Sequence, residues 1–219
     1  MTDRVVLVTG ASGFIGTWVL RLLLQEGARA VALDMGRAEH RWRQVLGERG
    51  GEIAWVDAAL DDRDALEAAI RRHGVTHIIH LAALLTPDCQ ADPYLGCKVN
   101  VLGTTAVFDA ARRAGSVRAI CYASSYAVYG TEAPGPPMFY GAFKQAADLV
   151  AEQYWRHFEL PSLAVRPHIA YGPERDKGLT AGPSLACRAA ALGERYAIGY
   201  TGPAGYDYVE DAARAFVRG

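Results

Sequence analysis

Tyr140 and Lys144 are the residues of this chain whose types and spacing point most directly to chemistry, because they lie four positions apart. On a helix, positions i and i+4 share one face, so the Lys144 ammonium would lie near the Tyr140 ring. A nearby cation favours the ionised form of a phenol, whose ordinary pKa is about 10. We therefore expect Tyr140 to exchange a proton with a substrate hydroxyl, and Ser125 to hydrogen-bond the same oxygen. Taken alone, the spacing fits a solvated helix face better.

A glycine-rich turn far upstream strengthens the catalytic interpretation. It runs from Thr9 to Gly16, directly after an apolar run at 5–8 and directly before an apolar run at 17–24. A strand, a tight turn and a helix in succession are the context that a dinucleotide site needs. Gly10 permits the turn, Gly13 lets the backbone approach a pyrophosphate, and Gly16 allows the helix to pack on the strand, with phosphates at the positive helix N-terminus. An ordinary strand-to-helix turn is the alternative.

Asp34 favours the dinucleotide interpretation. It follows the apolar run at 30–33, which predicts a second strand, and lies about 20 residues past the glycines, where a carboxylate accepts hydrogen bonds from a ribose diol. The same carboxylate would repel a 2′-phosphate, which predicts NAD rather than NADP. Arg37 and Arg41 lie nearby and weaken that preference.

Together these residues resemble the extended short-chain dehydrogenase/reductase family, whose members include nucleotide-sugar epimerases and dehydratases. The resemblance covers nearly the whole chain and rests on ordered motifs at compatible spacings. These motifs are Thr9–Gly16, His77–Ala83, Asn100–Thr104, Ser124–Gly130, Tyr140–Lys144, Arg166–Pro173 and Tyr208–Asp211.

The resemblance implies an NAD-dependent enzyme with an α/β fold, a doubly wound parallel sheet of the Rossmann type. It makes Ser125, rather than Ser124, the catalytic hydroxyl, Tyr140 the catalytic base, and Lys144 a partner that also holds the nicotinamide ribose. No metal is expected. The cofactor-binding residues that it implies are Gly10, Ser12, Gly13, Phe14, Ile15, Gly16, Asp34, Leu81, Ala82, Ala83, Tyr140, Lys144, Pro167 and His168.

Three departures from the family pattern affect these expectations. The family often has Gly-Asp-Leu after the third strand, with an Asp that meets the adenine, whereas this chain has Ala58-Ala59-Leu60 and Asp57. Either Asp57 contacts the adenine in place of the family's Asp, or this contact with the adenine is missing. The segment from Gly130 to Tyr140 is short and proline-rich, so a substrate-side loop is trimmed. Family members usually continue for roughly a hundred residues beyond the position of Gly219, which leaves a natural short form, a fragment and an engineered piece as alternatives.

Composition excludes several other classes of function. The 23 basic and 24 acidic residues leave a net charge of −1, so no basic surplus points to nucleic acid or a membrane surface. No apolar stretch approaches the roughly 18 residues that span a bilayer, and the N-terminus lacks a signal-peptide pattern. The cysteines show no paired metal spacing, which favours reduced thiols in a cytoplasmic protein. They are Cys89, Cys97, Cys121 and Cys187.

Strand and helix signals alternate along the chain, which predicts a doubly wound sheet with right-handed crossovers. Strands are expected at about 4–9, 29–34, 52–56, 76–82, 117–123 and 162–166, several of them continuous apolar runs. Helices are expected at about 14–26, 38–47, 62–72, 96–114, 141–159 and 183–192.

The motif residues converge, because Gly10, Asp34, Ala82, Ser125 and Pro167 all fall at expected strand ends. Ligands of such sheets bind beyond the carboxyl ends of the strands, so one crevice is predicted. Residues 1–172 would then form the NAD-binding domain with the catalytic residues. Residues 173–219 would form a small, apparently truncated substrate-binding region.

Four other polar or charged positions have competing interpretations. His80 lies on an expected strand, where a packed, hydrogen-bonded core histidine is favoured. Asn100 is expected to make a structural hydrogen bond near the active site rather than to be a surface amide. His168 reaches either cofactor or substrate. Arg175 and Lys177 are expected to be solvated, with contact to a substrate phosphate or carboxylate as the alternative.

The sequence favours an NAD-dependent epimerase or dehydrogenase that acts on a secondary alcohol of a sugar or nucleotide sugar. Dehydratases of the family usually carry Asp-Glu after the catalytic hydroxyl residue, and Tyr126-Ala127 stands there instead, which disfavours dehydration. An NAD-binding sensor or scaffold without turnover is the alternative from another class. A homodimer is expected, because the family pairs its helices at 96–114 and 141–159 across a dimer axis. Their apolar residues include Val99, Val107, Phe108, Phe143, Leu149 and Val150.

Overall fold

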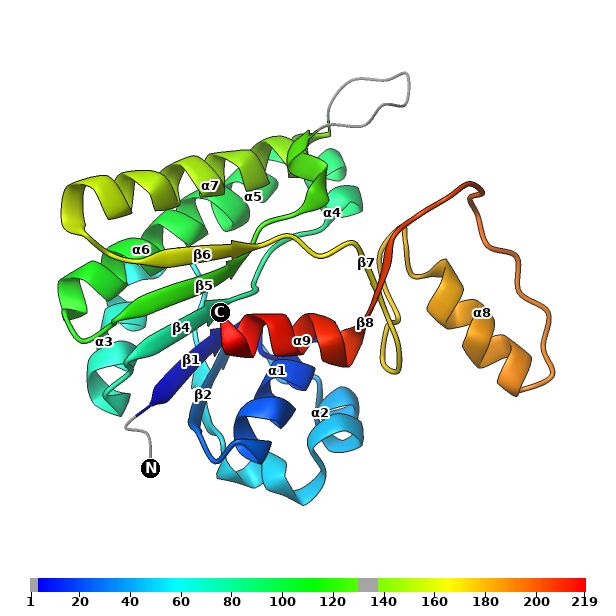
Figure 1. Cartoon of the computed structure of the whole chain (residues 1–219), viewed down its shortest axis with the longest axis horizontal. Helices are drawn as coiled ribbons and strands as arrows, with labels where there is room; N and C mark the ends of the chain where they lie inside the picture. The colour runs from blue at the N-terminus through cyan, green and yellow to red at the C-terminus, as the bar shows by residue number, and fades with distance from the viewer. Residues whose placement is uncertain (1–3, 130–137) are drawn as a thin grey trace.

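The computed structural model of the 219-residue chain describes residues 4–129 and 138–219. The end of the motif at Gly130 and the prolines Pro134, Pro136 and Pro137 lie outside the described residues. A six-stranded, fully parallel sheet forms the centre, in the order β3-β2-β1-β4-β5-β6 (Figure 1). The strands are β1 (Val5–Thr9), β2 (Arg29–Asp34), β3 (Ala54–Asp57), β4 (His77–His80), β5 (Ala119–Ala123) and β6 (Ser162–Val165).

This strand order is that of a doubly wound, dinucleotide-binding sheet, which confirms the predicted fold class. All six expected strands are present within two residues of their expected bounds. Every residue of β1 is buried, as both faces of a parallel sheet require. The order reverses between β1 and β4, so a crevice opens at the carboxyl ends of these two strands.

Helices cover both faces of the sheet (Figure 1). Val6 and Val8 point into a core shared with one set of helices, whereas Val5 and Leu7 point into a core shared with the other, as the alternation along a strand dictates. The first set is α1 (Phe14–Gln25), α2 (Glu39–Leu46) and α9 (Val209–Arg218). The second set is α3 (Arg63–His73), α6 (Gly103–Ala114) and α7 (Phe139–Phe158).

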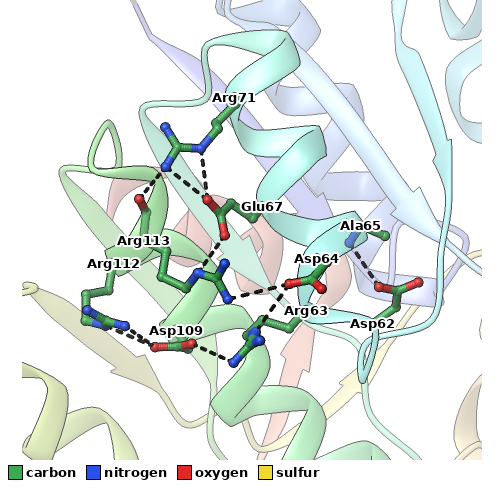
Figure 2. Close-up of polar contacts among 9 residues, drawn as sticks. All are labelled: Asp62, Arg63, Asp64, Ala65, Glu67, Arg71, Asp109, Arg112 and Arg113. Atoms are coloured by element: carbon green, nitrogen blue, oxygen red, sulfur yellow. Dashed lines mark hydrogen bonds and ion pairs between the residues drawn. The ribbon is translucent and has the colours of Figure 1, made fainter.

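Ion pairs tie α3 to α6 on the outer surface of the second layer (Figure 2). Glu67 accepts hydrogen bonds from Arg71 on its own helix and pairs with Arg113 of α6 at 2.7 Å, while Asp109 of α6 pairs with Arg112 and Arg63. At the start of α3, the Asp62 carboxylate accepts from the amide of Ala65 and caps the helix. Each exposed pair contributes little, so this network fixes how the helices align more than it stabilises the fold.

The helical stretch expected at 96–114 is longer and interrupted. It consists of α5 (Pro93–Cys97), a π-helical turn η2 (Lys98–Leu102) and α6, and the short helix α4 (Thr86–Ala91) precedes it. Such π turns occur frequently at functional sites, and this one contains Asn100. Two 3-10 turns, η1 (Gly47–Glu52) and η3 (Tyr126–Tyr129), complete this part of the chain.

The C-terminal part leaves the sheet and returns to it. β7 (Ile169–Tyr171) pairs in parallel with β8 (Tyr206–Tyr208), and α8 (Gly182–Ala191) lies between them in sequence and away from the central sheet (Figure 1). α9 then packs against α1 and adds Val209, Ala213, Phe216 and Val217 to the first core. The second part of the chain therefore contributes a two-stranded sheet of its own and also part of the first core.

Candidate active site

The glycine turn is set by close approach of neighbouring backbone. Gly10 has a φ of 68°, and a Cβ placed there would lie 2.6 Å from the amide nitrogen of Ala82. A Cβ at Gly16 would run into the carbonyl oxygen of Gly10. These positions therefore require glycine, the first for conformation and space, the second for space alone.

The first turn of α1 is built to receive an anion. Gly13 is the N-cap of α1, and no side chain among the described residues caps that end. Uncapped amides and the positive end of the helix favour a phosphate. Leu81, Ala82 and Ala83 directly follow β4, where the Leu81 amide donates to Thr9 and brings this segment alongside the glycine turn.

Asp34 closes the other side of the turn. Its carboxylate accepts hydrogen bonds from the amides of Ser12 at 3.0 Å and Met35 at 2.9 Å. Burial raises the pKa of Asp34, the two amide hydrogen bonds lower it, and the charge of Asp57 on the adjacent strand raises it. Arg41 donates to the Ser12 carbonyl, so the turn is fixed from both sides.

The two nearby arginines are already engaged. The Arg41 guanidinium pairs with Asp176 at 2.8 Å, and its side chain is only 13% exposed. The Arg37 guanidinium lies over the rings of Trp42 and Trp55 and pairs with Glu39. A 2′-phosphate would have to compete with these partners, which supports the preference for NAD that Asp34 predicts.

The two serines after β5 have different surroundings. The Ser124 hydroxyl donates to Asp148 at 2.9 Å and accepts from Arg166, which itself pairs with Asp148. The Ser125 hydroxyl instead accepts from the amide of Ala127 and lies close enough to the Tyr140 hydroxyl to lower its pKa, short of standard hydrogen-bond geometry. Catalytic hydrogen bonds are often loose before the ligand binds. Ser125 is thus the serine that faces Tyr140.

Tyr140 and Lys144 lie on one face of α7, as their spacing predicts. The Lys144 ammonium is 5.8 Å from the centre of the Tyr140 ring and donates to the carbonyl oxygen of Ala123 at 2.6 Å. Burial lowers the pKa of Lys144 to about 8, although Asp148 and Cys89 act in the opposite direction. The ammonium is held by the end of β5, which places it beside the crevice.

The expected direction of the Tyr140 pKa is wrong for the protein without ligands. Burial raises the pKa of this phenol and outweighs the effects that lower it, which come from the Ser125 hydroxyl and the charge of Arg175. The reason is that Lys144 points its ammonium toward a backbone carbonyl, and Tyr140 is itself largely enclosed. The cation that lowers this pKa is therefore Arg175 rather than Lys144.

The comparisons with known proteins agree with this geometry. The model of the NAD dependent epimerase/dehydratase family matches residues 6–218. The chain belongs to this family. It is of the extended short-chain dehydrogenase/reductase type, a family of NAD-dependent epimerases and dehydrogenases.

Two curated relatives and one solved structure illustrate the range of the family. A UDP-glucose 4-epimerase from Mycolicibacterium smegmatis is 32% identical, over 97% of this chain and 72% of its own length. A D-erythronate dehydrogenase from Cupriavidus necator is 30% identical, over 74% of this chain and 56% of its own length. The structure of UDP-glucose 4-epimerase from Thermus thermophilus in complex with NAD is 28% identical, with a TM-score of 0.82 over 97% of this chain and 73% of that one.

The epimerase/dehydratase family assignment establishes NAD as the cofactor class, and the residues present fit it. The uncapped N-terminus of α1, the glycines that leave no room for a Cβ, and the carboxylate of Asp34 at the end of β2 are the features that the pyrophosphate and ribose need. Both relatives are named as enzymes, and nothing in the comparisons favours a dinucleotide sensor. No helix in the described part of the chain is long and apolar enough to cross a membrane.

We expect Asp34→Ala to weaken NAD binding and to relax the rejection of NADP. The carboxylate is replaced by a methyl group, so the predicted ribose hydrogen bonds and the repulsion of a 2′-phosphate are both lost. Loss of hydrogen bonds to a charged group corresponds to a roughly 10- to 100-fold weaker affinity for NAD. Fluorescence titration with both dinucleotides measures the ratio, with Asp64→Ala, at an exposed position of α3, as the matched control. Tighter binding of NADP than of NAD by the unmodified protein would contradict the assignment.

His80 is a buried core residue of this family member, as expected. Thr104 donates to the carbonyl of Asn100 at 2.7 Å, so its oxygen accepts from His80 Nε2 at 2.9 Å. His80 Nδ1 is then the acceptor for the Thr9 hydroxyl at 2.7 Å. This chain of hydrogen bonds fixes the tautomer and joins the ends of β1 and β4 to the π turn.

We expect His80 to make the protein acid-sensitive. Burial and the charge of Lys144 lower the pKa of His80 to about 3. The unfolded chain takes up this proton as pH falls below about 6.5, while the folded chain does not, so the unfolding free energy decreases by up to about 1.4 kcal/mol per pH unit between pH 6.5 and 3. Chemical denaturation across this range should show a shallower pH dependence for His80→Gln. His157→Gln, at an exposed position of α7, should keep the slope of the unmodified protein, and equal slopes for all three proteins would refute the assignment.

Asn100 makes the structural hydrogen bonds that were predicted. Its side chain accepts from the amide of Leu84 at 2.7 Å and donates to the carbonyl of the same residue at 2.9 Å. It also donates to the sulfur of Cys89. The buried amide thereby holds the segment after β4 against the π turn, near Lys144.

His168 lies at the edge of the crevice. Its ring stacks on Tyr126 with 4.4 Å between centroids, and its amide donates to Asp207 at 2.8 Å. Pro167 precedes it directly after β6, in the segment predicted to meet the nicotinamide. Asp57 is exposed beside Asp34, and its contact with the adenine remains a prediction.

Arg175 was expected to be solvated, and the structure corrects this. Its guanidinium lies 5.4 Å from the centre of the Phe14 ring, donates to Thr180 at 3.3 Å, and acts on the pKa of Tyr140. Its Nε is buried. Lys177 is exposed, as expected. No local pattern distinguishes Arg175 from Lys177, because its burial depends on segments far apart in the sequence.

Proposed function

We propose that this chain catalyses hydride transfer between NAD and a secondary alcohol of a sugar or nucleotide sugar, as an epimerase or a dehydrogenase. The observation that carries the proposal is the grouping of Ser125, Tyr140 and Lys144 where α7 meets the end of β5, with the Lys144 ammonium 5.8 Å from the centre of the Tyr140 ring. The relatives that act on UDP-glucose and on D-erythronate support the substrate class.

Each residue would have a separate role. NAD, held by residues of the glycine turn and Asp34, would supply the hydride acceptor. Tyr140 would exchange the proton of the substrate hydroxyl, and Ser125 would hydrogen-bond the same oxygen. Lys144, whose ammonium is fixed by Ala123, would hold the nicotinamide ribose.

Dehydration is disfavoured by the residues that follow Ser125. Tyr126 and Ala127 occupy the first positions of η3, where the dehydratases of the family usually carry Asp and Glu. Tyr126 is exposed, stacks on His168 and meets Tyr129 edge to face, and neither Tyr126 nor Ala127 carries a carboxylate for an elimination. Epimerisation and plain oxidation therefore remain as the two reactions.

A screen of NAD reduction against nucleotide sugars, sugar acids and amino-alcohols tests the proposal. We expect at least one class to give NAD-dependent turnover, or inversion at one carbon detected by NMR. Proton NMR of the recovered sugar separates epimerisation from net oxidation. Binding of NAD with no turnover or inversion in any class would contradict the proposal.

Three broader expectations belong to the same proposal. Residues 1–172 would form the NAD-binding domain and 173–219 a partial substrate region, except that α9 packs on α1 and belongs to the core of the first domain. A cytoplasmic location is supported only by four cysteines that are all free thiols. A homodimer is supported by exposed apolar side chains on η2 and α7, but not by Val107 and Phe108, which are buried in the second core. The exposed side chains include Leu102, Leu149, Trp155 and Phe158.

A further inference from the structure

Arg175 places a guanidinium with an unused donor inside the candidate active site. The turn after β7 positions it, because the Arg175 amide donates to the carbonyl of Gly172 at 3.3 Å. The side chain reaches back to the start of α1, where it lies over Phe14, and one Nη donates to Thr180. The Nε is buried and has no hydrogen-bond partner among the residues that the structure describes.

A second unused donor lies near it. The Tyr200 hydroxyl is also buried and finds no hydrogen-bond partner within the described ranges, since Tyr206 is near but outside hydrogen-bonding geometry. The charge of Arg175 lowers the pKa of both Tyr200 and Tyr140, so the guanidinium acts on both phenols. Two unused donors from separate segments thus lie on the side of the chain that carries Arg175.

No carboxylate of the described residues neutralises this guanidinium through a hydrogen bond. Asp176 is the acid that acts most on Arg175, yet its carboxylate is bonded to Arg41 at 2.8 Å. Burial lowers the pKa of Arg175, because the charged guanidinium is less stable away from water than in it. Buried donors and charges are normally paired, so the free Nε fits a bound group that the protein itself does not supply.

We propose that Arg175 and Tyr200 bind a carboxylate on the substrate whose hydroxyl meets Tyr140. This inference rests on the proposed function and narrows it to substrates that carry an acidic group a few bonds from the reacting carbon. A guanidinium with a free Nε edge matches the planar oxygens of a carboxylate. Phosphate oxygens are recognised by a guanidinium in the same way. The pyrophosphate of the cofactor is therefore a second possible source of the anion, since Arg175 lies over Phe14 in the turn proposed to receive it. The test separates these two sources.

The test compares ligands that differ only in the carboxylate. The protein saturated with NAD is titrated calorimetrically with UDP-glucuronate and UDP-glucose, and with D-erythronate and erythritol. We expect at least one acidic ligand to bind 10-fold or more tightly than its neutral counterpart. Arg175→Gln should reduce the affinity for that acidic ligand by about 10- to 100-fold, leave the neutral ligand unchanged and abolish the preference.

Control variants separate charge from folding. Tyr200→Phe removes one donor without changing the charge and should reduce the preference partially, while Arg188→Gln, at an exposed position of α8, should preserve it. Arg175→Lys keeps the charge but loses the planar fork, so we expect an intermediate preference. Circular dichroism of each variant checks the fold.

The outcomes that overturn the inference are distinct. Equal affinity for acidic and neutral ligands in the unmodified protein excludes a carboxylate site. A loss of NAD affinity in Arg175→Gln, with the preference for the acidic ligand retained, assigns the guanidinium to the pyrophosphate instead. Carboxylate binding that depends on Arg175 without any turnover overturns the proposed function and leaves the inference standing. Turnover of neutral substrates at a rate that Arg175→Gln does not change overturns the inference and leaves the proposed function standing.

Discussion

Replacement of Tyr140 by Phe is expected to lower turnover by about 10²- to 10⁴-fold while NAD affinity changes less than twofold. The phenol hydroxyl serves proton exchange with the substrate, whereas the ring, which phenylalanine keeps, fills the same space on α7. Steady-state rates with the substrate found by the screen measure the first effect. Fluorescence titration with NAD measures the second.

The matched control is Tyr154→Phe. Tyr154 lies on the same helix, and its ring packs on Phe108 away from the glycine turn, so loss of its hydroxyl should leave turnover within a factor of two. Because burial raises the Tyr140 pKa, the rate of alcohol oxidation should increase with pH through the alkaline range. Full activity of Tyr140→Phe would overturn the assigned mechanism.

Replacement of Lys144 by Met is expected to abolish turnover and yet to stabilise the NAD-free protein. Lowering the pKa of this buried lysine from 10.5 to about 8 costs the folded state roughly 3 kcal/mol at pH 7. Removing it leaves the Ala123 carbonyl without its donor, at a cost of about 1–3 kcal/mol. The net expectation is an unfolding free energy about 1 kcal/mol higher at pH 7, together with weaker NAD binding.

The pH dependence of the unfolding free energy shows whether the charge of Lys144 causes the difference in stability between the two proteins. Between pH 8 and 10.5 the unfolded chain holds a proton that the folded chain has released, so the unmodified protein gains stability as pH rises. The advantage of Lys144→Met should therefore narrow over this window, as measured by urea denaturation at several pH values. Lys177→Met, at an exposed position, should show no such change. A pH-independent difference would show that packing, not charge, separates the variants.

Features that depend on local sequence were predictable. The glycine turn, Asp34 and the six strands follow from hydrophobic runs and from spacing within a short segment, and they lie within a few residues of their expected bounds. α9 could have been found as well, since Val209, Ala212, Ala213, Phe216 and Val217 recur at helical spacing.

Features that depend on distant segments were not predictable. The direction in which Lys144 points is set by the carbonyl of Ala123, 21 residues earlier in the chain. The burial of Arg175 requires Phe14 from the start of the chain and Thr180 from the C-terminal part. The sequence alone points to Lys144 as the cation that lowers the Tyr140 pKa, because Lys144 is the nearest basic residue along the helix. In the structure Arg175 has this effect instead.

The parallel pairing of β7 with β8 brings together two segments that lie far apart in the sequence. The chain leaves the core beside the point where it re-enters, because Ile169 is in register with Tyr206 and Tyr171 with Tyr208. The segment between these two strands contains α8, Arg175 and Tyr200, and its two ends are held together by the strand pairing. Backbone cleavage inside this loop would leave both new ends anchored, one through β7 and the other through the packing of α9 on α1. Cleavage of the backbone between Arg175 and Tyr200 would thus leave the core formed by the sheet and α1 folded.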